Sequence, residues 1–321
     1  MLQRRLTMLA ALCLCAAFLA FGQTNSATLS GSLSDVQGLP LKTARVELRS
    51  AATGAARNVT VNSDGLFEVP ALPPGDYKVS VQAKGFSPLQ QSIRLEVGQQ
   101  MRLDLKLSVG SKLENLDVVA RAEILKTSDA SLGEVVETKS IKELPLNGRM
   151  LIDLALTVPG SHIGHGAQTG DMNALYWRPG QRSAITIGGN RPNANYFLVD
   201  GVTNTDPTFN TQNLSLSPDA VQEFQVQTGS YAAELGGAGG GQINIVTHSG
   251  TSRFHGTMYE FLRNNAIDAR TFNEMSGDNH LVQNNFGASL GGPVYGKKTF
   301  FFVNYEAFRM TQAMTMTDTV P

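Results

Sequence analysis

The five histidines are the residues of this sequence best suited to binding a metal ion. They are His162, His165, His248, His255 and His280. His162 and His165 are three residues apart, but they lie in a glycine-rich stretch without a third ligand at the spacing of a metal site. The sequence therefore predicts no metal centre.

Residues for covalent or acid–base catalysis are also scarce. Both cysteines, Cys13 and Cys15, lie in an apolar leader, so a mature chain would have no thiol. We expect no nucleophile elbow. Asp200 and Asp206 flank a turn, where aspartate more often forms the turn than a catalytic carboxylate pair. The sequence therefore predicts no enzyme activity.

A glycine-rich run from Gly236 to Gly241 invites comparison with phosphate-binding loops. Such a loop needs Lys followed by Ser or Thr at the start of a helix. Here Gln242 and Ile243 follow and open a strand. The glycines are therefore expected to permit tight backbone packing, and neither a nucleotide nor another cofactor is expected.

The composition favours turn-rich β structure. The chain has 321 residues, a formal net charge of −1, 17% charged residues and 32 glycines. Lysine and arginine are not concentrated in any run, so a nucleic-acid partner is not expected.

Residues 1–22 have the pattern of a secretory signal peptide. Arg4 and Arg5 form the basic region, Leu6 to Phe21 the apolar region, and Ala20-Phe21-Gly22 a small-x-small cleavage site. A transmembrane anchor is the alternative, but an apolar run of about 16 residues is shorter than the roughly 20 that span a bilayer. We therefore expect an exported protein whose cleavage position stays open.

Residues 28–109 consist of short alternating runs, such as Ala44 to Leu48 and Tyr77 to Val81, separated by Gly- and Pro-containing turns. About seven short strands with frequent turns are typical of an antiparallel β-sandwich. The strings "GSLSDVQGLPLKTARVEL" and "VNSDGLFEVPALPPGDYKVSVQAKGF" resemble the carboxypeptidase regulatory-like domain. The resemblance implies a structural or docking module without catalytic residues, and sugar binding would rest on fold alone.

Residues 110–137 are expected to be a linker. Within it, Leu113 to Ala120 is a short β-prone stretch that an exposed edge of another protein's sheet could pair with. The stretch resembles a TonB box, whose candidate residues are Leu116, Asp117, Val118, Val119 and Ala120. The alternatives are a plain linker and the first strand of the next domain.

Residues 138–250 mix helix and strand signals. A helix is predicted from Arg149 to about Val158 with Asn147 as a candidate cap, and Ser217-Pro218-Asp219 has the chemistry of a helix start. Strands are predicted at Ile185 to Arg191, Asn195 to Val202, Gln222 to Gln227 and Gln242 to Thr247.

The order of these segments resembles the plug domain of TonB-dependent receptors, especially the Oar-like group. The resemblance rests on "ELPLNGR", "VPG", "ITIGGNRPNANYFLVDGVTNTD" and "LSPDAVQEFQVQTGSYAAELGGAGGGQINIVTHSGT". Gly164 to Gln181 departs from the pattern and is a candidate apical loop. Tyr176, Trp177 and Arg178 are its candidate ligand contacts, although packing of Trp177 inside the plug is the more common outcome.

Residues 251–321 alternate like strands of a membrane barrel. Arg253 to Arg263 places Tyr259 and Phe261 on one face and Met258 on the other, and Phe286 to Leu290 and Thr299 to Arg309 alternate similarly. "SRFHGTMYEFLRNNAIDARTFN" and "NNFGASLGGPVYGKKTFFFVNYEAFR" resemble the opening strands of the Oar-like barrel. Three strands cannot close a barrel in lipid, so we expect a truncated barrel.

The expected fold class is mainly β: an N-terminal antiparallel β-sandwich, an α+β plug domain and the first strands of an incomplete transmembrane β-barrel. The resemblance implies the N-terminal portion of an outer-membrane receptor for an unidentified solute, driven by a TonB-type energy-coupling protein and not transport-competent alone. Its N-terminal domain would face the periplasm. The alternatives are a periplasmic or surface module that binds glycan or protein through the sandwich, and a gene remnant without function.

Overall fold

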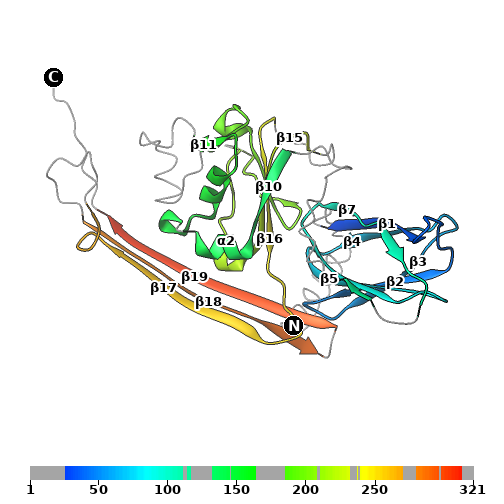
Figure 1. Cartoon of the computed structure of the whole chain (residues 1–321). Coiled ribbons are helices and arrows are strands. Elements are labelled where there is room, and N and C mark those ends of the chain that lie inside the picture. Colours follow the sequence, from blue (N-terminus) through cyan, green and yellow to red (C-terminus); the bar gives the residue numbers. More distant parts are fainter. Residues whose placement is uncertain are drawn as a thin grey trace, which may run out of the picture.

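The computed structural model describes residues 26–110, 114–116, 132–144, 146–163, 185–207, 210–231, 237, 239–269, 280–295 and 298–312. The expected signal peptide at residues 1–22 lies outside this set. Among the residues it describes, no helix is both long enough and apolar enough to cross a membrane. The protein is mainly β and has three parts: a sandwich, a middle unit of residues 132–250, and a layer of three long strands (Figure 1).

The sandwich is built from two sheets that enclose one apolar core. One sheet has the strand order β3-β2-β5-β6-β9, and the other joins β4, β1 and β7, with β8 also on β1. The strands are β1 Ala27–Asp35, β2 Ala44–Ser50, β3 Ala56–Thr60, β4 Leu66–Leu72, β5 Gly75–Ala83, β6 Leu89–Leu95, β7 Gln100–Arg102, β8 Leu105–Leu107 and β9 Glu114–Leu116.

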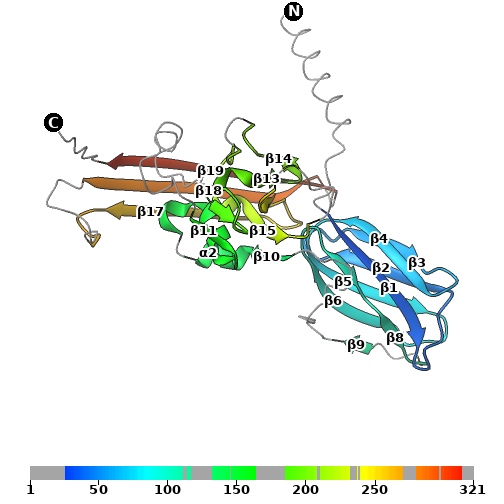
Figure 2. The ribbon, with the colours of Figure 1, turned by 90° about the horizontal axis from the view of Figure 1, so that it is seen from above.

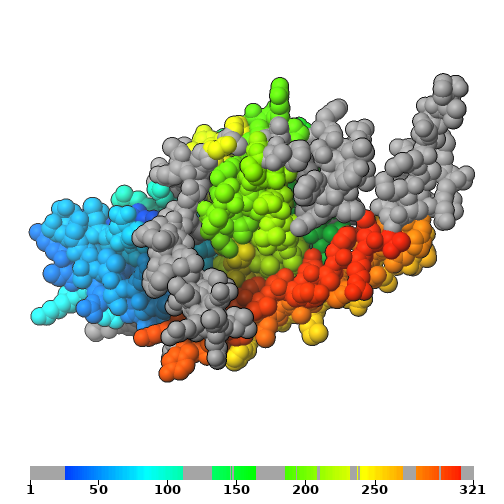
Figure 3. All heavy atoms as spheres, turned by 180° about the vertical axis from the view of Figure 1, so that it is seen from behind, coloured from blue at the N-terminus to red at the C-terminus, as the bar shows by residue number. Residues whose placement is uncertain are grey.

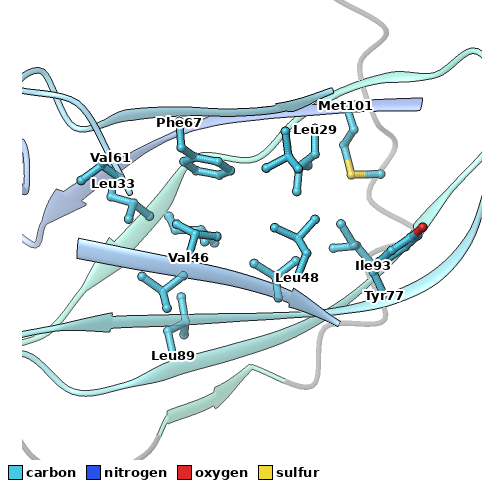
Figure 4. Packing of buried hydrophobic residues seen from close by; sticks show 14 of the residues in the cluster. Leu29, Leu33, Val46, Leu48, Val61, Phe67, Tyr77, Leu89, Ile93 and Met101 are labelled. Atoms are coloured by element: carbon cyan, nitrogen blue, oxygen red, sulfur yellow. The ribbon is translucent and has the colours of Figure 1, made fainter. Parts of the chain in front are cut away.

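The alternation of buried and exposed residues explains why these segments form strands. In β1 each apolar or small residue at every second position is buried, and β2 and β5 repeat the pattern. Leu29, Val46, Leu48 and Phe67 point into the space between the sheets (Figure 4). The predicted β-sandwich is therefore observed, and β9, which lies in the segment expected to be a linker, adds a strand to it.

The middle unit wraps short helices around a second sheet. The sheet has the order β10-β15-β16-β13-β14, in which β13 and β16 run parallel. The elements of the middle unit are β10 Leu132–Glu137, α2 Thr138–Glu143, η1 Asn147–Arg149, η2 Leu151–Thr157, β11 Ser161–Ile163, β12 Ile185–Ile187, η3 Pro192–Ala194, β13 Tyr196–Val199, β14 Val202–Thr203, η4 Pro218–Ala220, β15 Val221–Gly229 and β16 Gln242–Thr247. A separate core holds it together, with Phe197 and Phe224 fully buried.

The predicted helix from Arg149 to about Val158 is wrong in type and start. The chain forms two short 3-10 helices instead, and the second begins at Leu151. Gly148 and Arg149 have positive φ values of 67° and 57°, which no right-handed helix accommodates, so the chain turns sharply before Leu151. The predicted apolar face is nevertheless buried, as Leu154 and Ala155 are both 0% exposed.

The glycine run ends where the backbone passes through a tight space. A Cβ on Gly241 would lie 2.4 Å from Cγ2 of the buried Ile187, and one on Gly240 would lie 2.7 Å from the carbonyl oxygen of Ala194. A side chain at either position would therefore displace its neighbours. Close packing is thus the role of these two glycines.

The third part is a layer of three long antiparallel strands. They are β17 His255–Asn264, β18 Leu281–Tyr295 and β19 Thr299–Gln312, in that spatial order. The layer runs along the middle unit in two perpendicular views (Figures 1 and 2) and forms one flank of the molecule in the space-filling view (Figure 3). Met258 is 90% exposed on the far face, whereas Tyr259 contacts the middle unit, so the predicted alternation is confirmed.

Candidate functional site

A compact polar cluster joins the middle unit to the strand layer. It consists of Arg149, Ser217, Asp219, Tyr259 and Glu306, and we call it the Arg149 cluster. The guanidinium pairs with the Asp219 carboxylate through Nη2, and its Nε lies 3.5 Å from Glu306 Oε2. Glu306 Oε2 also accepts hydrogen bonds from the Ser217 hydroxyl at 2.8 Å and the Tyr259 hydroxyl at 2.7 Å. Four separate segments of the chain therefore meet at one carboxylate and one guanidinium.

Aromatic rings complete the surroundings of Arg149. The guanidinium carbon lies 4.5 Å from the centroid of the Tyr259 ring and 4.3 Å from that of Phe261. Both rings come from β17, and at these distances the cation is attracted to the ring faces. Arg149 thus binds the strand layer by charge and by ring contact together.

Local backbone geometry positions the members of the cluster. Positive φ values at Gly148 and Arg149 turn the chain after α2. Ser217 begins η4, where its hydroxyl accepts the backbone N–H of Asp219 at 3.3 Å. The helix start predicted at Ser217-Pro218-Asp219 is confirmed in this short form.

The cluster is largely shielded from water, and this burial determines the strength of its ion pairs. The side chains of Arg149, Asp219 and Glu306 are 14%, 11% and 21% exposed. Ion pairs at such burial are screened less than surface pairs, and loss of one partner leaves a costly unpaired charge. One guanidinium and two carboxylates therefore hold the middle unit against the strand layer, and attachment is the role that these contacts support.

Sequence reasoning did not identify this cluster. The motif strings "ELPLNGR" and "LSPDA" contain Arg149 and Asp219, but these residues are 70 positions apart, and Ser217 and Glu306 are 89 apart. The available signal in the sequence was that both residues lie within these motifs. Nothing in the local pattern indicates that they meet.

The candidate TonB box is described only at its first residue. Leu116 ends β9, which pairs in parallel with β6 so that Leu116 lies opposite Gln91. The other candidates, Asp117, Val118, Val119 and Ala120, lie outside the described residues, as do the candidate ligand contacts Tyr176, Trp177 and Arg178. Their roles stay predictions.

The residues first considered for chemistry have other roles where they are described. Among the described residues, no group of three or more His, Cys, Asp or Glu side chains could hold a metal ion. Asp200 accepts the backbone N–H of Thr247 at 2.9 Å and thereby fastens the end of β16. Burial lowers the pKa of His248 to about 4, so this side chain is neutral at pH 7 and packs 5.6 Å from the Phe302 ring.

One string overlooked in the sequence requires a correction. Gly287-Ala288-Ser289-Leu290-Gly291 has the G-x-S-x-G pattern of a nucleophile elbow. In the structure Ser289 lies in the middle of β18, whereas an elbow needs a sharp turn between a strand and a helix. Its hydroxyl is 2.8 Å from the Thr257 hydroxyl, so it serves as a cross-strand partner.

Two protein families match separate parts of this chain. Residues 28–108 match the carboxypeptidase regulatory-like domain, and residues 246–321 match an outer membrane beta barrel domain. The second match covers the three long strands. The chain is thus similar to a carboxypeptidase regulatory-like domain in one region and to an outer-membrane β-barrel in another, which supports an outer-membrane location.

A curated relative makes the resemblance more specific. The chain is 29% identical over 301 residues to the TonB-dependent transporter Oar of Myxococcus xanthus. The alignment covers 89% of this chain and 27% of that relative, so the chain spans about a quarter of the relative's length. The resemblance to Oar-like TonB-dependent receptors is therefore confirmed.

Solved structures show weaker likenesses. The siderophore receptor PirA from Acinetobacter baumannii is 21% identical, with a TM-score of 0.40, over 55% of this chain and 24% of its own. Hydroxyquinol 1,2-dioxygenase from Pseudomonas putida DLL-E4 is 11% identical, with a TM-score of 0.24, over 29% of this chain and 59% of its own. Similarities of this extent carry no functional assignment.

Proposed function

We propose that this chain is the N-terminal portion of a TonB-dependent outer-membrane receptor that imports a solute. Residues 132–250, which include β10 of the middle sheet, form its plug, residues 110–131 its coupling linker, and residues 251–321 the start of its barrel. The observation that carries the proposal is the Arg149 cluster, which fastens the middle unit to the polar face of barrel-like strands. The similarity to a TonB-dependent transporter supports the same assignment.

The cluster suits a plug that must hold and still be released. Its bonds are directional and few, so displacing Arg149 by a short distance breaks them together. Once water enters, the separated charges are solvated and attract one another weakly. A mechanical pull on the plug would therefore meet resistance at this point.

The pull would be applied at the segment from Leu116 to Ala120. A TonB-type protein would bind this segment by adding it to a sheet edge through main-chain hydrogen bonds. In support, Leu116 ends β9, so the backbone entering the segment is already extended and paired to a sheet. The partner is inferred from this geometry and from the similarity to a TonB-dependent transporter.

Proline in this segment tests the coupling proposal. We expect Val118→Pro to weaken binding of the periplasmic domain of a TonB-type protein by at least about tenfold, because proline removes a main-chain donor. Ser128→Pro, in the same linker but outside the segment, serves as the control and should bind normally. The measurement is the dissociation constant by calorimetry, and equal affinities for both variants would refute the coupling role.

The solute stays unidentified, and Tyr176, Trp177 and Arg178 are the proposed contacts to it. An aromatic pair beside a guanidinium suits a ligand that has an aromatic ring or a sugar face and that also carries negative charge. We further propose that this chain alone does not transport. Among the described residues the three-stranded sheet ends at β17 and β19, and further strands would have to pair with those edges to close a barrel in lipid.

A second candidate function is binding of glycan or protein by the sandwich. The observation in its favour is a hollow of about 660 Å³ on the sandwich whose lining includes Lys42, Arg45 and Lys84. Three cations beside one hollow would suit an anionic sugar. Binding of the chain to a glycan array, lost on changing Lys42 and Lys84 to glutamine, would favour this candidate.

A further inference from the structure

Glu223 is a carboxylic acid buried where the sandwich meets the middle unit. It lies in β15, and its side chain is 0% exposed. Its Oε2 accepts the backbone N–H of Val97 at 2.9 Å, and Val97 follows β6 in the sandwich. A side chain of the middle unit therefore replaces water at a main-chain group of the sandwich.

Two neighbours of Glu223 extend this contact. Gln225 Nε2 donates a hydrogen bond to the carbonyl oxygen of Val97 at 3.3 Å, and Gln222 Nε2 donates one to that of Pro74 at 3.1 Å. Three residues of one strand thus bind two loops of the sandwich. The junction is polar, so its strength depends on the charge state of its one buried acid.

The charges around Glu223 do not balance. Arg94 of β6 brings one positive charge, with Nη2 3.8 Å from Glu223 Oε1, Nε 3.5 Å from Glu137 Oε1 and Nη1 3.7 Å from Asp76 Oδ1. Glu137 lies directly opposite Glu223 in the β10–β15 ladder, and Glu96 adds a further negative charge. One guanidinium therefore pairs with three carboxyl groups, while Glu96 acts on Glu223 as a further negative charge.

This imbalance favours the neutral form of Glu223. Burial raises its pKa to about 7, and the charges of Glu96 and Glu137 act in the same direction, while the Val97 N–H and Arg94 oppose the rise. Oε1 has no hydrogen-bond partner among the described residues. A proton on this oxygen removes the cost of burying an unbalanced charge.

We propose that Glu223 is a proton-controlled contact: its protonated side chain keeps the sandwich docked on β15, and loss of the proton releases the sandwich. In the released state Glu223 would be in water with an ordinary pKa near 4.5. The docked state thus binds the proton more tightly, so docking is strongest below about pH 4.5 and weakens as the pH rises through about 7. Because β9 pairs with β6, release would also move the start of the linker. The inference goes beyond the proposed transport function and does not depend on it.

Hydrogen exchange of the Val97 amide tests the proposal directly. The full chain in detergent micelles is exchanged at pH 5 and pH 8, with rates corrected for the intrinsic effect of pH. The two pKa values above predict that protection of the Val97 amide falls about 70-fold between these conditions. Protection within β2 of the sandwich and β16 of the middle unit should stay constant, since the domains separate without unfolding.

Three variants decide between the outcomes. Glu223→Gln keeps the shape without the titration, so its Val97 protection should not change with pH. Arg94→Gln removes the cation and should move the midpoint to a higher pH. Glu134→Gln, an exposed acid on β10, is the control and should behave like the wild type.

The proposal is overturned if wild-type protection is constant with pH, or if β2 and β16 lose protection in parallel with Val97. It is also overturned if Glu223→Gln keeps the 70-fold change. Should Glu223→Gln fail to fold, Arg94→Gln decides the question, because an unchanged or lower midpoint contradicts the role of Glu223.

Discussion

Replacing Arg149 with methionine is expected to weaken the attachment of the middle unit to the strand layer and to lower the free energy of unfolding by about 3 kcal/mol. Methionine keeps much of the length and apolar contact of the side chain, but it leaves Asp219 and Glu306 without their cation. Both carboxylates are largely buried, so the unpaired charges dominate the loss. Arg149→Lys should recover only part of it, because lysine cannot stack a planar cation on Tyr259 and Phe261.

The measurement is urea unfolding of the full chain in micelles, followed by hydrogen exchange in β15. Arg263→Met is the matched control, since Arg263 pairs with Asp268 at 2.5 Å in the same strand layer but is 45% exposed. That change should cost under about 1 kcal/mol. Equal losses for the two variants would show that the Arg149 cluster is no stronger than a surface pair.

Replacing Asn195 with leucine is expected to destabilise the middle unit by about 2–4 kcal/mol. The Asn195 side chain is 0% exposed, and its Nδ2 donates to the carbonyl oxygen of Ile185 while its Oδ1 accepts the N–H of Gly241 at 3.1 Å. One amide thus joins β12 to the start of β16. Leucine has a similar volume but leaves both main-chain groups buried and unpaired.

Thermal unfolding of the middle unit, read from exchange in β16, measures this effect. Asn58→Leu is the control, because Asn58 is exposed in β3 of the sandwich. The control should leave the middle unit unchanged. A loss below about 0.5 kcal/mol for Asn195→Leu would mean that water replaces its hydrogen bonds.

Strand positions in the sandwich could be predicted because one face of each strand is buried. The regular burial of β1, β2 and β5 is visible as alternation of residue types. Strand β3 was missed, since four of its five residues are exposed and no alternation marks it. Its position is set by pairing with β2, which a local pattern does not encode.

The central strand of the strand layer, β18, was predicted too short for a related reason. The prediction covered Phe286 to Leu290, but β18 extends from Leu281 to Tyr295. Its buried positions include the polar Gln283 and Asn285, so polar residues are buried there where apolar residues would usually mark the interior. A strand with a polar side facing the interior gives a weak sequence signal.

The Arg149 cluster shows why the candidate site was harder to predict than the fold. Its geometry depends on positive φ values at Gly148 and Arg149 and on the register that brings Tyr259 beside Glu306. Both are properties of the folded chain. The sequence identified the motifs that hold Arg149 and Asp219, and the structure supplied the reason they belong together.

Single-molecule pulling tests the central claim that the segment from Leu116 to Ala120 acts on a plug held by the Arg149 cluster. Handles would be attached through the substitutions Val118→Cys and Met258→Cys, the second on the exposed face of β17, with Cys13 and Cys15 changed to serine. The account predicts that the first rupture separates the middle unit from the strand layer, and that Arg149→Met lowers the force of this event while Arg263→Met does not. An unchanged first rupture in Arg149→Met would contradict it.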